Sequence, residues 1–201
     1  MAREAAVPPA GRQPVACPAF VPEWPLGWIG QAEEAALGSW DEVVGSAPEL
    51  AGAVRALFDA HRHKTLATLR RDGSPRISGI EANFVAGDLW LGMMPNSRKA
   101  LDLLRDPRMA LHSATVDPPD DPAAYEGDAK LSGRAEEVSD PVRLRAYLDA
   151  TGQAGQEQPG SFHLFRVDVT EVVLTRVGDP PDHLVIELWR EGQGLRRTRR
   201  Y

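Results

Sequence analysis

The sequence predicts a mainly β (α+β) protein, a small antiparallel barrel with peripheral helices. Consecutive stretches alternate polar and apolar residues with period two, and short turns such as Asp72-Gly73 and Gly87-Asp88 separate them. Strands joined by such short turns must pair antiparallel, because parallel neighbours need a long crossover. No fixed-period repeat is present and predicted strands outnumber helices, so a small barrel is the favoured class.

Three helices are predicted from capping signals and from apolar residues at helical spacing. Ser46 and Glu49 form a Ser-x-x-Glu capping box, in which each side chain satisfies a free backbone N–H. Pro141 suits a first helical turn, since the N–H that it lacks would have no partner there. The predicted helices run from Ser46 to about Arg62, from Asn96 or Ser97 to Asp106-Pro107, and from Ser139 to about Ala150.

Seven strands are predicted between and after these helices. The turns at Asp72-Gly73 and Gly87-Asp88 join the first three strands, which are therefore expected to pair in sequence order as a meander. The stretch from Asp117 to Pro122 is rich in proline and aspartate and is predicted to be a loop. The predicted strands cover residues 64–70, 75–84, 89–94, 108–115, 129–138, 162–177 and 184–189.

Residues 1–45 are predicted to form an irregular N-terminal arm, ahead of one domain that covers residues 46–201. Prolines from Pro8 to Pro25 exclude long helices from this stretch. Three tryptophans, Trp24, Trp28 and Trp40, lie in it as well. So much apolar surface favours an arm packed on its own domain or on a second subunit, with a ligand-binding role as the alternative.

Composition excludes several classes of function. The 201 residues carry a net charge of −6, which argues against a protein that coats nucleic acid by bulk electrostatics. Cys17 is the only cysteine, so the chain has no internal disulfide and no multi-cysteine metal cluster, as is typical of a reducing cytoplasm. No apolar run is long enough to span a membrane, and the early prolines argue against a secretory signal. We therefore expect a cytoplasmic protein without nucleic-acid or membrane partners.

Ser97, Arg98 and Lys99 are the most informative short motif, because they place two cations in the first turn of a predicted helix. The helix dipole disfavours positive charge there. A bound anion would reverse that effect, since free backbone N–H groups, a hydroxyl and two cations together make a phosphate cradle. The alternative is a solvated surface pair of charges. Lysine occurs only three times in the chain, so its use at position 99 supports the cradle.

Other candidate residues give weaker signals. Arg76 and Ser78 project from one face of a predicted strand and could reach a common ligand, although exposed strand residues alternate in the same way. The five histidines match no zinc pattern, and no metal site is predicted. The arginines within residues 196–200 are interpreted as a solvated charge run. The motifs of common hydrolases are missing, so a bound cofactor is expected to supply the chemistry.

Four motifs follow one another along the chain. They are Leu66-Ala67-Thr68-Leu69, Asp72-Gly73-Ser74-Pro75, Ser97-Arg98-Lys99 and Asp106-Pro107-Arg108-Met109-Ala110-Leu111. In this order they resemble the pyridoxamine 5′-phosphate oxidase-like, FMN-binding split-barrel family, and over roughly residues 50–190 the element order also agrees. The resemblance implies a split barrel, in which Ser97, Arg98 and Lys99 grip the cofactor phosphate. It also implies a homodimer with one flavin at each end of the subunit interface.

Two departures from that family change the expected activity. Glu81 lies where authentic pyridoxamine phosphate oxidases have a lysine, and the Arg-Leu-His-Asp-Arg motif that they carry after a tryptophan is missing after Trp189. Vitamin B6 oxidation is therefore not expected. We expect an FMN-dependent oxidoreductase that acts on a small organic molecule, with Arg76 and Ser78 lining the cofactor groove and Trp189 flanking the ring system.

Three alternatives remain open at this stage. Related split barrels use a deazaflavin of the coenzyme F-420 type in place of FMN. A non-catalytic flavin- or haem-binding protein would have the same fold without turnover. A barrel that has lost its cofactor and serves as a structural partner is the third alternative.

Overall fold

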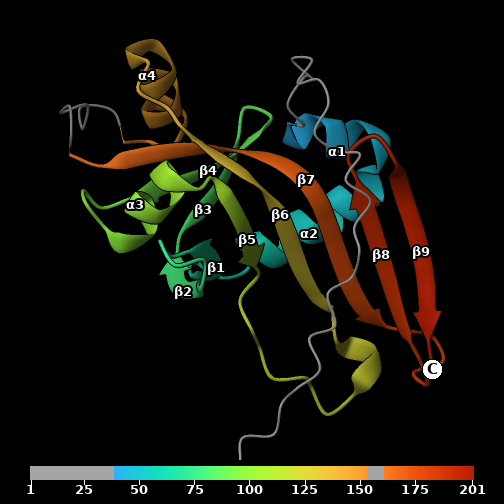
Figure 1. Ribbon diagram of the computed structural model, residues 1–201. Helices are drawn as coiled ribbons and strands as arrows, with labels where there is room; N and C mark the ends of the chain where they lie inside the picture. The colour runs from blue at the N-terminus through green and yellow to red at the C-terminus, as the bar shows by residue number, and fades with distance from the viewer. Residues whose placement is uncertain (1–38, 154–160) are drawn as a thin grey trace, which may run out of the picture. The chain divides into compact units, whose positions relative to one another are not determined.

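The computed structural model describes residues 39–153 and 161–201, and it confirms a mainly β fold with helices around an antiparallel sheet (Figure 1). None of the helices in these residues is long and apolar enough to cross a membrane. The helices are α1 Trp40–Ser46, α2 Pro48–Asp59, α3 Arg98–Arg105, the 3-10 turn η1 Pro122–Ala124, and α4 Pro141–Ala150. The strands are β1 Lys64–Leu69, β2 Pro75–Ile80, β3 Ala82–Val85, β4 Asp88–Met93, β5 Arg108–His112, β6 Asp128–Glu137, β7 His163–Val177, β8 Leu184–Arg190 and β9 Gly194–Arg200.

The sheet is antiparallel throughout, and its main path has the order β2-β1-β5-β6-β7-β4-β3. Strand β7 is long enough to serve two neighbours on one side: residues 163–167 pair with β4, and residues 171–177 pair with β8. Strand β9 then pairs with β8 alone. The sheet therefore divides along β7 into a barrel part and a two-stranded β8–β9 extension.

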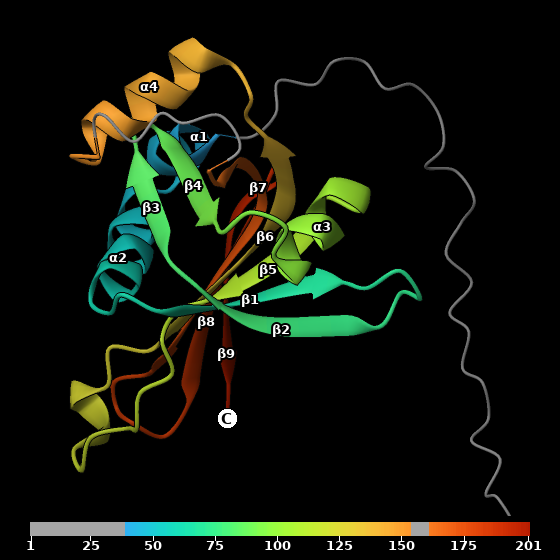
Figure 2. The ribbon, with the colours of Figure 1, turned by 90° about the vertical axis from the view of Figure 1, so that its left-hand side faces the viewer.

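The predicted meander is wrong in one respect, because residues 75–84 form two strands instead of one. β2 pairs with β1, whereas β3 pairs with β4, and β2 and β3 are the two ends of the main strand path. Glu81 separates them, so the chain itself passes from one end of the path to the other (Figure 2). This covalent crossing closes the barrel, and it brings the end of β2 beside the start of α3.

A β-bulge bends the longest strand pair. The register between β6 and β7 shifts between Ser132 and Gly133, and Thr170 falls in the gap with its hydroxyl donating to Ser132 O at 3.2 Å. A side chain at Gly133 would meet the carbonyl oxygen of Asp168 at 2.1 Å. Only glycine fits there, since backbone cannot move aside as a flexible side chain can.

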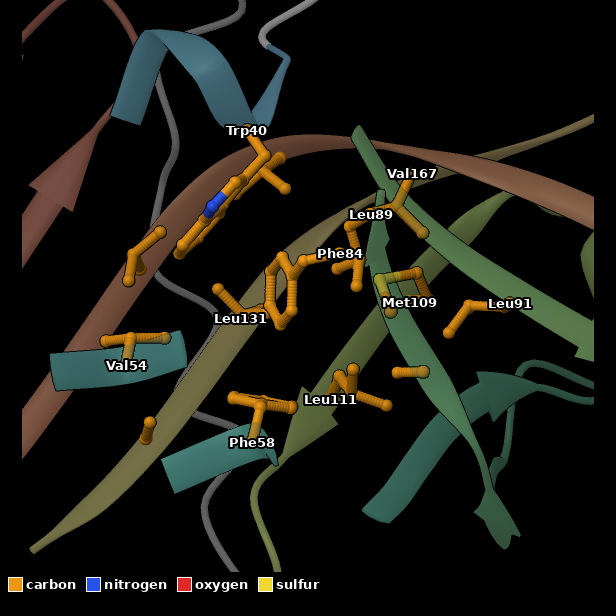
Figure 3. Close-up of a cluster of buried hydrophobic side chains, with 14 of the residues drawn as sticks. Trp40, Val54, Phe58, Phe84, Leu89, Leu91, Met109, Leu111, Leu131 and Val167 are labelled. Carbon is orange, nitrogen blue, oxygen red and sulfur yellow. The ribbon is translucent and has the colours of Figure 1, made fainter. Parts of the chain in front are cut away.

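Aromatic rings from both helices and strands fill the barrel (Figure 3). The Phe84 ring of β3 lies 4.5 Å from the Trp40 ring of α1 and 5.8 Å from the Phe58 ring of α2. Leu131 and Val167 of the two longest strands belong to the same buried cluster. α4 covers a second, smaller cluster that includes Trp90 and Tyr147. The helices α1 and α2 therefore belong to the core and are not only peripheral.

The predicted capping box at Ser46 is wrong. Ser46 ends α1, where its hydroxyl donates to Glu42 O at 2.6 Å, and the residue that caps α2 is Ala47, whose side chain makes no cap hydrogen bond. Most of α1 lies in residues 40–45, which we assigned to the irregular arm, and it packs into the core. The rest of that arm, with Trp24 and Trp28, lies outside the described residues.

We predict that Trp40→Ala destabilises the fold by about 3–5 kcal/mol, because it removes a large buried ring and leaves a cavity. Trp40 is 3% exposed, whereas Val44 of the same helix is 41% exposed. Urea unfolding followed by circular dichroism measures the effect, with Val44→Ala as the matched control. Equal small losses in the two variants would show that α1 is not part of the cooperative core.

Candidate functional site

A cavity of about 880 Å³ opens between the barrel and α4. Its walls come from segments far apart in sequence: the β2–β3 crossing, the end of β4, the start of α3, α4, and the residues just before β7. Ser97 and Lys99 lie on one wall, and His63, Tyr147 and Phe162 are among the residues of the others. Ligand sites commonly measure roughly 300–1,000 Å³, so a cofactor-sized molecule fits this volume.

The turn into α3 presents Ser97 to this cavity. Asn96 has a left-handed backbone with φ of 55°, and the Ser97 N–H donates to Met94 O at 3.2 Å. Ser97 is the N-cap residue, since its carbonyl accepts the first helical bond from Leu101. Its side chain, however, makes no cap hydrogen bond. The Ser97 Oγ atom is buried and has no hydrogen-bond partner among the described residues, so it is available to a ligand.

Lys99 lines the same cavity. The Nζ atom donates to Gly79 O at the end of β2. Burial lowers the pKa of Lys99, and none of the carboxylates within the described part of the chain forms an ion pair with it. Arg98, in contrast, is exposed and does not line the cavity. Ser97 and Lys99 are therefore brought together, with Arg98 beside them on the outer side of the first helical turn.

Arg76 is held by a buried carboxylate on α3. Its Nε donates to Asp102 Oδ2 at 2.6 Å, and the same oxygen accepts from Thr68 Oγ1 of β1 at 2.9 Å. The other oxygen of Asp102 accepts from Arg105 at 3.2 Å. Burial opposes ionisation of Asp102, but the hydrogen bonds from Arg76, Thr68 and Arg105 outweigh it and hold its pKa below the usual value.

The predicted shared face of Arg76 and Ser78 agrees with the burial of β2, in which positions 76, 78 and 80 are covered and their neighbours are exposed. Ile80 from this face lines the cavity, whereas Arg76 and Ser78 do not. Sequence reasoning missed Asp102, because a polar residue inside a short amphipathic helix gives no signal of its partners on other elements.

Trp189 lies in a different part of the molecule. It is buried in the core beneath α1, where its indole N–H donates to Ser46 Oγ at 2.8 Å. It does not line the cavity that holds Ser97 and Lys99. Within one chain, Trp189 is therefore a packing residue that joins β8 to α1.

The cavity is also lined by hydrogen-bonding groups that the sequence did not reveal. Asn83 Nδ2 donates to the hydroxyl of Tyr147 at 2.9 Å, and burial raises the pKa of that phenol. Glu81 also lines the cavity and pairs with Arg62 at 2.9 Å. The cavity thus has a cationic end at Lys99 and a polar, hydrogen-bonding wall at Tyr147.

The sequence itself shows the family. The family model described as pyridoxamine 5′-phosphate oxidase matches residues 50–176, which run from α2 almost to the end of β7. The chain therefore belongs to the pyridoxamine 5′-phosphate oxidase family of split barrels, which contains oxidoreductases that use flavin or deazaflavin. The resemblance noted in the sequence is confirmed. The curated proteins include no match to the chain.

Solved structures share the fold at low identity. PhzG from Burkholderia lata 383, solved with tetrahydrophenazine-1-carboxylic acid, is 14% identical with a TM-score of 0.53, covering 80% of this chain and 94% of PhzG. A heme binding protein from Mycobacterium smegmatis is 18% identical (TM-score 0.49; 76% and 88% covered). An F420 reductase is 20% identical (TM-score 0.43; 59% and 94% covered). The likeness to PhzG supports the fold alone.

We predict that Asp102→Asn lowers the free energy of unfolding by about 3 kcal/mol at pH 7. The substitution removes the buried carboxylate with which Arg76 and Arg105 form ion pairs. The lowered pKa means that this contribution is complete above the unfolded value of 3.8 and is lost as pH falls through the lower folded value.

The free energies of unfolding of wild type and Asp102→Asn, measured with urea, should therefore become equal only in acid. Asp59→Asn is the control, since Asp59 pairs with Arg55 on the surface of α2 and such pairs are worth at most about 1 kcal/mol. A difference between wild type and Asp102→Asn that persists unchanged to pH 2 would contradict the assignment.

Proposed function

We propose that the chain is an FMN-dependent oxidoreductase in which Ser97, Arg98 and Lys99 bind the phosphate of the cofactor. The observation that carries this proposal is the buried Ser97 Oγ, which has no hydrogen-bond partner within residues 39–153 and 161–201 and lies at the N-terminus of α3 in the same cavity as Lys99. Phosphate oxygens accept from hydroxyl, ammonium and guanidinium donors and from free backbone N–H groups at a helix start. The start of α3 carries all four kinds of donor: Ser97 and Lys99 line the cavity, Arg98 lies beside them on the outer side, and the helix contributes its first backbone N–H groups.

Charge supports the same assignment. Two cations in the first turn of α3 oppose the helix dipole, at about 0.3–1 kcal/mol each. Burial lowers the pKa of Lys99 as well, so its charge is unfavourable in the protein alone. A phosphate dianion removes both penalties, because it neutralises the cations and interacts favourably with the helix N-terminus.

Arg76 and Ser78 support this site from β2. Asp102 engages the Nε edge of Arg76 and thereby fixes the direction of its guanidinium, and Ser78 lies between Arg76 and the cavity-lining Ile80 on the same face. We leave Trp189 out of the binding site of its own chain, because it is buried in the core.

FMN supplies hydride and single-electron transfer when it is bound. The residues of the chain would hold the phosphate at Lys99, cover the cofactor with the apolar side chains of Met93 and Phe162, and offer hydrogen bonds from Tyr147. A small organic substrate would occupy the part of the cavity that the cofactor leaves. Vitamin B6 phosphate is disfavoured as the substrate, since the Arg-Leu-His-Asp-Arg motif of authentic pyridoxamine phosphate oxidases is missing after Trp189.

We predict that Arg98→Ala combined with Lys99→Ala weakens FMN binding at least about 30-fold, since each lost charge-assisted hydrogen bond is worth about 1.5–3 kcal/mol. Riboflavin, which lacks the phosphate, should bind wild type and variant within about twofold of each other. Quenching of flavin fluorescence gives both dissociation constants.

The matched control is Arg71→Ala combined with Lys130→Ala, which removes the same charges from exposed positions outside the cavity. Its FMN affinity should equal that of wild type. Equal losses for FMN and riboflavin in the Arg98/Lys99 variant, with the fold intact by circular dichroism, would refute the phosphate cradle.

The absorbance spectrum of the purified protein separates the alternatives. Yellow protein that releases FMN on denaturation supports the proposal, whereas colourless protein that binds only an added deazaflavin supports a coenzyme F-420 type of reductase. Haem would give a Soret band and requires an axial ligand, for which His63 is the histidine that lines the cavity. A Soret band that His63→Ala removes would establish haem in place of FMN.

A homodimer is part of the proposal, with a flavin at each end of the interface. Apolar side chains near the cavity support it: Met94, which lines the cavity, is 74% exposed, and Ile77 on β2 is 68% exposed. Exposed apolar groups of this size are typical of contact surfaces. Sedimentation velocity should give twice the mass of one chain, and a single-chain mass at micromolar concentration would contradict the dimer.

A further inference from the structure

A second cavity, of about 560 Å³, lies by the turn from β7 to β8 and the end of β9, which is marked C in Figure 1. It shares no lining residue with the first cavity. Its floor is apolar, because α2 contributes small and aliphatic side chains and the strands contribute valines. The floor residues are Ala53, Ala56, Leu57, Val177 and Val185.

Arginines form one side of this cavity, and a buried carboxylate holds two of them. Arg176, Arg197 and Arg199 all line it. The Glu187 side chain, 3% exposed, accepts from Arg197 Nη2 at 2.6 Å and Nε at 3.2 Å, and from Arg176 through its other oxygen. Because Glu187 fixes their directions from beneath, the two guanidinium groups are pre-organised for a further acceptor.

The alternation of β9 selects which arginines face the cavity. Arg197 pairs with Glu187 and Arg199 pairs with Val185, so both project from the cavity face of the β8–β9 pair. Arg196 and Arg200 project from the opposite face and do not line the cavity. The cluster that the sequence predicted to be a solvated charge run is therefore split between two faces of an edge strand.

Two carboxylates also line the cavity, and both are on loops. Glu126 precedes β6, Asp179 follows β7, and both residues are exposed. The arginines, in contrast, lie on one face of three adjacent strands, because Arg176 and Arg199 both pair with Val185, and Arg197 pairs with Glu187 on the same face. Positive charge is therefore grouped on one side of the cavity, whereas the two carboxylates are on separate loops.

We propose that this second cavity binds a small organic anion, a carboxylate carried on an apolar ring or chain. The apolar body would lie on the floor formed by α2 and the two valines. The carboxylate would accept hydrogen bonds from Arg197 and Arg199, which already lie on one face of β9. This proposal does not depend on FMN binding in the first cavity.

Three probes that share one apolar body test the charge preference: 2-naphthoate, 2-naphthalenemethanol and 2-naphthylmethylammonium. Isothermal titration of the full chain measures their affinities. The anion should bind at least about fivefold more tightly than the neutral alcohol, and the cation should bind most weakly. Tightest binding of the cation would show that Glu126 and Asp179 dominate, and equal affinities would show a purely apolar site. Either result would overturn the proposal.

Arg199→Gln and Arg200→Gln form a matched pair, because they remove the same charge from the same strand on opposite faces. Arg199 is exposed, so its loss should leave the fold intact. We predict that Arg199→Gln weakens 2-naphthoate binding at least about fivefold, whereas Arg200→Gln changes it less than twofold. Equal effects of the two variants would refute a binding site in the second cavity. They would show that 2-naphthoate is attracted to β9 only by its overall positive charge.

The first cavity is lined by Lys99, so binding of 2-naphthoate in the first cavity must be distinguished from binding in the second. In the Arg98→Ala, Lys99→Ala variant, the affinity for 2-naphthoate should stay within twofold of wild type if the second cavity holds it. A loss in that variant, together with no effect of Arg199→Gln, would place the anion in the first cavity and contradict the inference. The affinity for 2-naphthoate is measured independently of the affinity for FMN, so either proposal can fail without the other.

Discussion

The buried carboxylate of Asp102 joins three elements of the fold, and the position of the candidate site depends on it. Through Thr68, Arg76 and Arg105 it ties α3 to β1 and β2, next to the point where the chain crosses to β3. Lys99, one turn earlier on α3, meets β2 again at Gly79. These contacts fix the N-terminus of α3 against the barrel, so that Ser97 and Lys99 face one cavity.

An acidic chain with a net charge of −6 concentrates positive charge at two cavities, by different means. In the first, the partly buried Lys99 has no ion-pair partner among the carboxylates of the described residues, and an anion that binds there would compensate its charge. In the second, Glu187 neutralises part of the charge of Arg176 and Arg197 and fixes their geometry. The first arrangement favours a tightly held dianion, and the second favours a monoanion that exchanges with solvent.

Local signals in the sequence predicted most of the elements, and long-range contacts account for what it missed. The helix predicted from Ser139 to about Ala150 is present as α4, because its start depends only on neighbours: Pro141 opens it and Asp140 caps it. The break of residues 75–84 into two strands escaped notice, since period two continues through the crossing at Glu81. β9 was missed because its arginines hide the strand pattern, and their pairing with Glu187 is visible only in three dimensions. Ser97 and Lys99 could be proposed from the sequence because charge placement at a helix start is itself a local signal.

The state of the phosphate in bound FMN tests the central claim most directly. A free phosphate monoester gains its second proton near about pH 6. If Ser97, Arg98, Lys99 and the start of α3 hold it, the ³¹P resonance of protein-bound FMN should remain that of the dianion between about pH 5 and pH 8. A resonance that titrates near pH 6, as in free FMN, would show that the phosphate lies in solvent and would contradict the account.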